Sequence, residues 1–273
     1  METIFPPFDP DESASRPRVR RMRQIPIRMI LPNLVTLLGL CAGLTAIRMA
    51  IENRYGEAIA MIVIAAVLDA IDGRVARLLR SASRFGAELD SLADFVNFGV
   101  APAIILYVWA LDAAHSLGWI AALVFSICAA LRLARFNVAL DGPTKPDWHG
   151  NFFTGVPAPA GALIVLLPLY LQNLGLPIAE TGVPVVLFYT FAIGLLMVSR
   201  LPTWSGKKMG ARIPRELVLP MFVIVVIGAA SLLSYPWHVL AFGAMAYLLM
   251  LPLGWRRFRQ LEQETLAEPP PEA

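Results

Sequence analysis

The sequence predicts an all-α polytopic membrane protein, and three observations carry this prediction. The 273 residues are 57% hydrophobic and have a mean hydropathy of +0.63, which is too apolar for an ordinary soluble domain. Apolar segments recur at close to the ~20 residues that a helix needs to cross a bilayer. Basic residues gather in alternate connections between these segments, as they do in proteins that cross a membrane several times.

The apolar segments predict about eight transmembrane helices within one membrane domain, residues 29–254. We expect a basic cytoplasmic tail over residues 1–28 and a disordered cytoplasmic tail over residues 255–273, where charged residues and prolines replace the apolar pattern. The eight helices are expected at residues 29–47, 58–79, 86–111, 117–133, 156–174, 183–201, 217–233 and 239–254.

The distribution of Lys and Arg predicts which side of the membrane each connection faces. All of them except Arg48 and Arg54 fall in the two tails, in alternate connections, or at the ends of the helices that border these connections. Because Lys and Arg accumulate on the cytoplasmic side, both termini are expected to be cytoplasmic. The formal net charge of only +3 favours anionic lipid headgroups over nucleic acid as the partner of these basic residues.

Four aspartates lie inside two of the apolar segments, where charge is costly. A single ionised side chain at the centre of a transmembrane helix costs about 2.5–3.5 kcal/mol on insertion scales. A group of four therefore indicates a function. They are Asp69 and Asp72 in one segment and Asp90 and Asp94 in the next.

Helical geometry predicts that these aspartates meet. At about 100° per residue, each segment carries its polar residues on one face. An antiparallel hairpin that turns near residues 81–84 then brings all four carboxylates to one depth, about 15 Å from the cytoplasmic ends of the helices. The face of the first segment comprises Asp69, Asp72, Gly73, Ala76 and Arg77, and the face of the second comprises Gly86, Asp90, Asp94 and Asn97.

Carboxylates packed this closely repel one another unless cations lie between them. Oxygen ligands alone favour Mg²⁺ or Mn²⁺, and two such ions can hold a diphosphate and stabilise charge on the attacking and leaving oxygens. Arg77 adds a donor for phosphate oxygens. Two other interpretations stay open from the physics alone: a helix pair with structural Asp–Arg ion pairs, and a transporter of divalent cations or protons.

The spacing of these residues resembles a family signature. The chain matches D-x2-D-G-x2-A-R-x8-G-x3-D-x3-D at every fixed position from Asp69 to Asp94, and this pattern is similar to that of the CDP-alcohol phosphotransferases. The resemblance implies a six-helix core and an alcohol that attacks a CDP-linked lipid with release of CMP. It also implies that the four aspartates hold a two-metal centre and that Asp94 is in addition the general base.

The same resemblance implies a binding site for the donor, CDP-diacylglycerol, on the first three predicted helices. One position departs from the family pattern, because Gly39 stands where many relatives carry a polar Asn. The residues implied to bind the donor are Asn33, Thr36, Gly73, Ala76, Arg77, Ser83 and Gly86.

Longer stretches, at residues 90–102, 134–137, 155–160 and 202–207, resemble one group within this family, the bacterial membrane-integral phosphatidylserine synthases. This resemblance implies L-serine as the acceptor, the bacterial inner membrane as the location and a homodimer. Acceptors such as glycerol 3-phosphate, inositol phosphate or choline stay open, and arginines at this end of a helix also satisfy the positive-inside rule without any such role. The residues expected to bind serine are Asn97, Arg132, Arg135 and Asn137.

Overall fold

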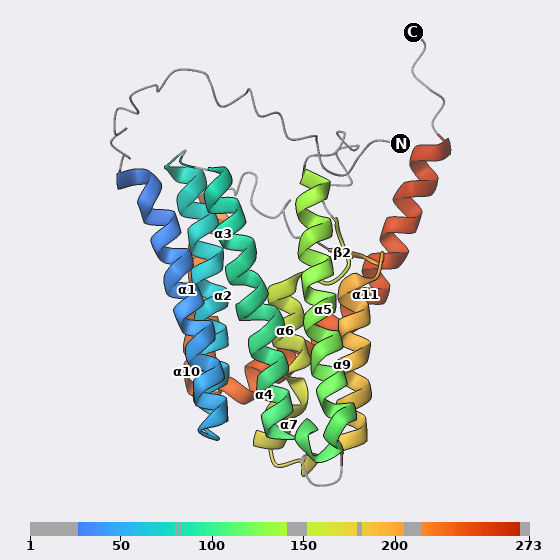
Figure 1. Cartoon of the computed structure of the whole chain (residues 1–273). Coiled ribbons are helices and arrows are strands. Elements are labelled where there is room, and N and C mark those ends of the chain that lie inside the picture. The colour runs from blue at the N-terminus through green and yellow to red at the C-terminus, as the bar shows by residue number, and fades with distance from the viewer. Residues whose placement is uncertain are drawn as a thin grey trace, which may run out of the picture.

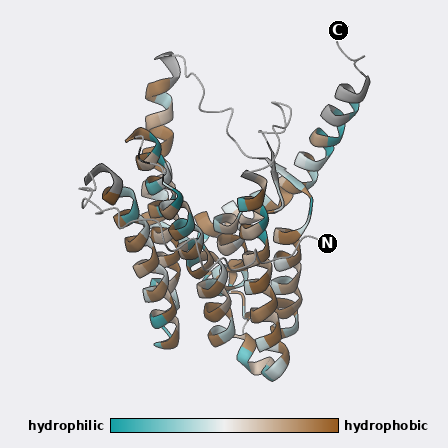
Figure 2. Ribbon diagram, turned by 45° about the horizontal axis from the view of Figure 1, so that its top comes forward, coloured by the Kyte–Doolittle hydropathy of each residue, from teal (hydrophilic) through white to brown (hydrophobic). Residues whose placement is uncertain are grey.

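The computed structural model describes residues 27–79, 81, 83–140, 152–178, 182–204 and 215–267. Within these ranges the helices pack side by side as a bundle (Figure 1), and hydrophobic residues run along most of their length (Figure 2). The predicted tail over residues 1–28 lies almost entirely outside the described residues.

Helix is present in each of the eight segments for which it was predicted. Among the described residues, four helical stretches are long and apolar enough to cross a membrane, namely Ile30–Ile51, Arg84–Trp109, Leu111–Ala139 and Pro236–Gln260, and three apolar helices are shorter. The count of eight crossings therefore stays a prediction. The elements in chain order are α1 (Ile27–Ile51), α2 (Tyr55–Leu78), α3 (Arg84–Asp94), a π-helix (Phe95–Val100), α4 (Ala101–Trp109), a 3-10 helix (Leu111–Ala114), α5 (His115–Leu140), β1 (Phe152–Thr154), α6 (Ala158–Val165), α7 (Leu167–Asn173), α9 (Val183–Val198), β2 (Pro202–Trp204), α10 (Arg215–Ser234) and α11 (Pro236–Ala267).

The predicted hairpin of α2 and α3 is confirmed, with its turn at the expected place. Helix α2 ends at Leu78 and α3 begins at Arg84. Ser83 is the N-cap of α3, and its hydroxyl accepts a hydrogen bond of 3.0 Å from the backbone N–H of Gly86, which satisfies one of the free amides at the helix start. The hairpin packs against α1 through both of its helices.

The third predicted helix is continuous but contains a wide turn directly after Asp94. The Ala101 N–H donates to the carbonyl of Val96, five residues back, and so closes a π-turn. Pro102 follows, and because proline has no N–H it cannot make the regular bond to the residue four places earlier. Such π-turns are frequent at functional sites.

The helix predicted over residues 156–174 is present as the apolar stretch Ala158–Asn173 but is interrupted at one residue. Helices α6 and α7 meet at Leu166. Pro168 lies in the first turn of α7, where the missing N–H of proline does no harm, although it would break the interior of one long helix.

The prediction of a disordered tail is wrong for residues 255–267, because α11 continues to Ala267. The loss of the apolar pattern after residue 254 marks a change of surroundings and not the end of the helix. Arg, Gln and Glu are good helix formers in water, and the Arg257 guanidinium donates to Gln260 Oε1 at 3.2 Å, one turn along. Residues 268–273 lie outside the described residues.

A two-stranded antiparallel ribbon of β1 and β2 ties together the connections that follow α5 and α9 and is the one departure from an all-α fold among the described residues. Thr203 Oγ1 donates to the carbonyl of Gly155 at 2.8 Å and fastens one end of it. Helix α11 packs against β2, α6 and α7. The sequence does not reveal strands of three residues, because they are too short to show alternation.

Candidate active site

The aspartates of the α2–α3 hairpin converge as the helical spacing predicts. One carboxylate oxygen from each of Asp69, Asp72 and Asp90 lies within 4.8 Å of the other two. Asp72 is buried, and Asp69 and Asp90 are half-buried. Asp94 lies one turn further along α3 and interacts electrostatically with Asp69 and Asp90.

This donor set fits a hard divalent cation. All the groups that converge are carboxylate oxygens, which is the ligand type of Mg²⁺ and Mn²⁺. None of the four aspartates makes an ion pair within the described part of the chain, where the ion pairs are those of Glu52 and Glu57 with Arg48 and Arg54. Like charges this close need a cation between them, and no Lys or Arg of the described residues lies within 4.0 Å to supply one.

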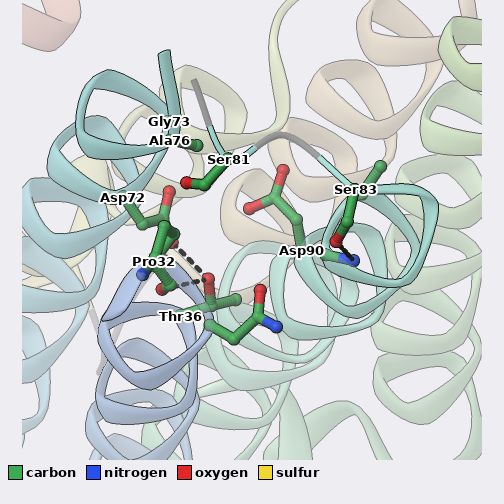
Figure 3. Close-up of a pocket in the computed structure, with 11 residues that line it drawn as sticks. Pro32, Thr36, Asp72, Gly73, Ala76, Ser81, Ser83 and Asp90 are labelled. Carbon is green, nitrogen blue, oxygen red and sulfur yellow. Dashed lines mark hydrogen bonds between the residues drawn. The ribbon is translucent and has the colours of Figure 1, made fainter. Parts of the chain in front are cut away.

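A pocket of about 140 Å³ opens beside the cluster. Figure 3 shows Asp72 from α2 and Asp90 from α3 on its walls, with Thr36 from α1 below Asp72. Six of the seven residues predicted to bind the donor line this pocket, the exception being Arg77. The lining consists of Pro32, Asn33, Thr36, Asp72, Gly73, Ala76, Ser81, Ser83, Gly86, Ala87 and Asp90.

Helix α1 fixes the position of Asp72 in this wall. The Thr36 hydroxyl lies 2.7 Å from Asp72 Oδ2 and 3.1 Å from the carbonyl oxygen of Pro32 (Figure 3). Thr36 is itself buried, so its hydroxyl is shielded from competing water. The bond orients one carboxylate oxygen and leaves Asp72 Oδ1 for another partner.

Two glycines of the pocket wall serve different purposes. A Cβ on Gly86 would lie 2.9 Å from Asn33 Oδ1 and 3.1 Å from Ser83 Oγ, so these two side chains would have to move to admit a larger residue between α1 and α3. A Cβ on Gly73 would meet only Arg77 Nη1, at 3.9 Å. The missing side chain of Gly73 is therefore not explained by packing within the protein, and it leaves free space in the pocket next to the Arg77 guanidinium.

Ser81 is a pocket residue that the sequence analysis missed. Its side chain is 4% exposed, and its hydroxyl has no hydrogen-bond partner among the described residues. Buried hydroxyls are normally bonded, so this group is available to a ligand. The signal was weak, because a serine in a predicted turn is expected without any function.

Arg132 is the predicted acceptor residue that the structure brings to the aspartates. It lies on α5, is only 9% exposed, and interacts electrostatically with Asp94 and Asp69. Its guanidinium carbon also lies 5.6 Å from the ring centre of Phe136.

The other three predicted acceptor residues have structural partners or surroundings of their own. Arg135 Nη1 donates to the carbonyl of Val198 at 2.7 Å and so caps the C-terminal end of α9. Asn137 Nδ2 donates to Ser91 Oγ at 2.9 Å. The buried amide of Asn97 occupies the space that Gly43 leaves on α1, because a Cβ on Gly43 would collide with Asn97 Oδ1. Their contact with an acceptor stays a prediction.

Comparison with known proteins agrees with this geometry. A family model described as CDP-alcohol phosphatidyltransferase matches residues 29–198, and one described as CDP-alcohol phosphatidyltransferase 2 matches residues 216–252. The chain is 42% identical over 251 residues to a protein of Mycobacterium leprae named CDP-diacylglycerol–serine O-phosphatidyltransferase, covering 90% of this chain and 80% of the relative. It is 32% identical over 226 residues to a protein of the same name from Helicobacter pylori, covering 83% of this chain and 91% of that relative.

Proposed function

The chain belongs to the CDP-alcohol phosphatidyltransferase family, and we propose that it transfers the phosphatidyl group of CDP-diacylglycerol to the hydroxyl of L-serine, giving phosphatidylserine and CMP. The observation that carries the proposal is the convergence of Asp69, Asp72 and Asp90 at a pocket between α1, α2 and α3. Serine as the acceptor rests on the names of the relatives, which span most of this chain.

The pocket is suited to the nucleotide end of the donor. Its lining offers the hydroxyls of Ser81 and Ser83 and the amide of Asn33 as hydrogen-bonding groups, and the exposed Arg77 lies beside Gly73 at its edge. Gly73 lets a phosphate approach the backbone of α2, and Arg77 offers a charge-assisted donor to it. Because the pocket lies at the end of the bundle where α2 turns into α3 (Figure 1), the acyl chains of the donor can stay in the bilayer.

Asp69, Asp72, Asp90 and Asp94 are the residues that would hold Mg²⁺ or Mn²⁺. A pair of such ions, when bound, supplies positive charge that offsets the charge of the phosphate oxygens. The chain contributes the orientation of its ligands, as in the Thr36 bond that fixes Asp72.

Asp94 is the residue that we assign as general base. An aliphatic hydroxyl is a poor nucleophile at neutral pH, so a carboxylate must accept its proton as the oxygen attacks. The serine oxygen forms a bond to the phosphorus that carries the diacylglycerol, and the bond from this phosphorus to the oxygen of CMP breaks. Asp94 lies deeper along α3 than Asp90 and close to Arg132, which would hold the acceptor.

The proposed enzyme resides in the bacterial inner membrane as a homodimer with both termini in the cytoplasm. The arginines near the active site lie towards the C-terminal ends of α2 and α5 and at the start of α3, whereas Arg48 and Arg54 lie where α1 ends and α2 begins. This separation supports the assignment of the active-site end to the cytoplasm, since basic residues accumulate there.

The test is CMP release by the purified full-length chain, given CDP-diacylglycerol, Mg²⁺ or Mn²⁺, and one alcohol at a time. We expect release with L-serine and little with glycerol 3-phosphate, inositol phosphate or choline. If CMP is released with another alcohol and not with serine, that alcohol is the acceptor. If no alcohol gives CMP release and proteoliposomes show cation or proton flux, the protein is a transporter and not this enzyme.

A further inference from the structure

A second polar cluster lies next to Asp94 and outside the lining of the pocket. It consists of Arg132 from α5, Thr203 from β2 and Tyr247 from α11. Arg132 interacts electrostatically with Asp69, Asp94 and Tyr247, and Tyr247 in turn interacts with Thr203 and Arg132. Three elements far apart in the sequence therefore bring polar side chains together, and Arg132 connects this group to Asp94.

Two of these groups are withdrawn from solvent and have no hydrogen-bond partner among the described residues. Within the described residues, Arg132 makes no hydrogen bond and no ion pair shorter than 4.0 Å, although it is 91% buried. The Tyr247 hydroxyl is buried and also has no hydrogen-bond partner there. An unsatisfied buried hydroxyl is costly, and an unsatisfied buried charge costs more. A guanidinium only donates and a tyrosine hydroxyl can donate, so one acceptor with negative charge would satisfy both groups.

Other tyrosines in the bundle show that this is unusual for the molecule. The Tyr170 hydroxyl donates to the carbonyl of Leu163 at 2.9 Å, and the Tyr189 hydroxyl donates to that of Ile164 at 2.7 Å. Thr203 donates its hydroxyl hydrogen to Gly155, and although it interacts with Tyr247, it is not within hydrogen-bond geometry of the Tyr247 hydroxyl. Tyr247 thus differs from Tyr170 and Tyr189 in having a hydroxyl with no bonded acceptor.

We propose that Arg132 and Tyr247 together bind the carboxylate of the acceptor amino alcohol, which makes Tyr247 a specificity-determining residue supplied by the C-terminal helix α11. The inference rests on the proposed function and deepens it. Helix α11 lies outside residues 29–198, the main family match, and reaches this place by packing against β2, α6 and α7 (Figure 1). The last helix therefore has a role in acceptor selection.

A phosphate of the donor has the same anionic chemistry, and the position of the cluster favours the acceptor. Neither Arg132 nor Tyr247 lines the pocket beside Asp72 and Asp90. Arg132 lies instead near Asp94, where the attacking hydroxyl must be. A carboxylate held here keeps the serine hydroxyl of the same small molecule within reach of Asp94.

The experiment measures CMP release by Tyr247→Phe in the full-length chain. We expect the KM for L-serine to rise about tenfold, which is the effect of losing one hydrogen bond to a charged group, while the KM for CDP-diacylglycerol changes less than about twofold. The variant also loses part of the preference for serine over ethanolamine, which is serine without its carboxylate. The melting temperature stays at that of wild type, because the hydroxyl makes no hydrogen bond with the described residues.

Tyr189→Phe is the matched control, since it removes a bonded hydroxyl from a half-buried tyrosine. It lowers the melting temperature and leaves the KM for serine unchanged. For Tyr247→Phe, an unchanged KM for serine overturns the inference, and so does a rise in the KM for CDP-diacylglycerol alone, which would assign the anion to the donor. A wild-type enzyme that does not use serine at all would instead overturn the proposed function.

Discussion

The acidic side chains at the two ends of the bundle differ in whether they have basic partners. At the end of α1 away from the active site, Glu52 is paired with Arg48 at 2.8 Å and with Arg54 at 3.2 Å, and Arg54 is also paired with Glu57. At the active-site end, Asp69, Asp72 and Asp90 converge, Asp94 follows one turn along α3, and none of the four makes an ion pair in the described part of the chain.

The glutamates are neutralised by arginines of the protein, whereas the aspartates require a ligand from outside the chain. The glutamates are exposed and in contact with arginines, so they need no ligand and contribute little. The aspartates are withdrawn from water, and their nearest charges are mainly one another. Such a group of acids costs folding free energy, so it indicates a bound cation that offsets the charge or a reaction that uses the carboxylates.

Loss of Asp94 is expected to have the largest effect. Asp94→Asn keeps the size of the side chain but cannot accept the serine proton, so turnover falls by about 10²–10⁴-fold, whereas binding of CDP-diacylglycerol largely survives. Turnover and donor binding are measured separately on the same preparation. If excess Mg²⁺ or Mn²⁺ restores activity, Asp94 is a metal ligand and not the base.

Addition of Mg²⁺ or Mn²⁺ is expected to raise the thermal stability strongly, because no Lys or Arg of the described residues forms an ion pair with the aspartates. At about 100 times its dissociation constant, a cation that binds only the folded state adds about 2.7 kcal/mol, which raises the melting temperature by several degrees. Asp90→Asn should melt higher than wild type in chelator, since one of the repelling charges is gone, and should respond less to Mg²⁺. A wild-type protein whose melting temperature ignores divalent cations contradicts the metal site.

Two arginines one turn apart on α5 differ in the same way: Arg135 is hydrogen-bonded to the protein, and Arg132 has no hydrogen bond to the described residues. Arg132→Ala should raise the KM for serine at least tenfold, the effect of removing a charged hydrogen bond of about 1.5 kcal/mol or more. Arg135→Ala is the control, because that guanidinium already bonds the Val198 carbonyl and its loss should mainly lower stability. The reverse order of KM values would restore Arg135 as the acceptor residue.

The two glycines of the pocket provide a smaller and more selective effect. In Gly86→Ala the new methyl group meets Asn33 Oδ1 at 2.9 Å, so we expect a loss of about 1–3 kcal/mol in stability. In Gly73→Ala the nearest side chain among the described residues is that of Arg77, with Nη1 3.9 Å from the methyl group, so the melting temperature stays and the KM for CDP-diacylglycerol rises. Equal melting temperatures for both variants would contradict this division of roles.

Sequence reasoning recovered the parts of this site that lie close together along the chain. The aspartate hairpin follows from helical periodicity over 26 residues, and Asn33 and Thr36 came from a resemblance to a family. Tyr247 was missed because its place beside Arg132 depends on how α11 packs on the ribbon, which no local pattern encodes. The length of α11 was predicted too short, because an apolar pattern indicates which residues lie in the membrane and does not show where a helix ends.

The smallest effect belongs to the paired acids at the opposite end. Hydrogen bonds from Arg48 and then Arg54 lower the pKa of Glu52 from its usual value of 4.5. The contribution of this pairing to stability is therefore complete above pH 4.5 and is lost as the pH falls below it. Because the group is exposed and screened, Glu52→Gln should leave CMP release and the melting temperature at neutral pH unchanged within error. A loss of activity comparable to that of an active-site aspartate variant would mean that these two ends are coupled, and the contrast between them would fail.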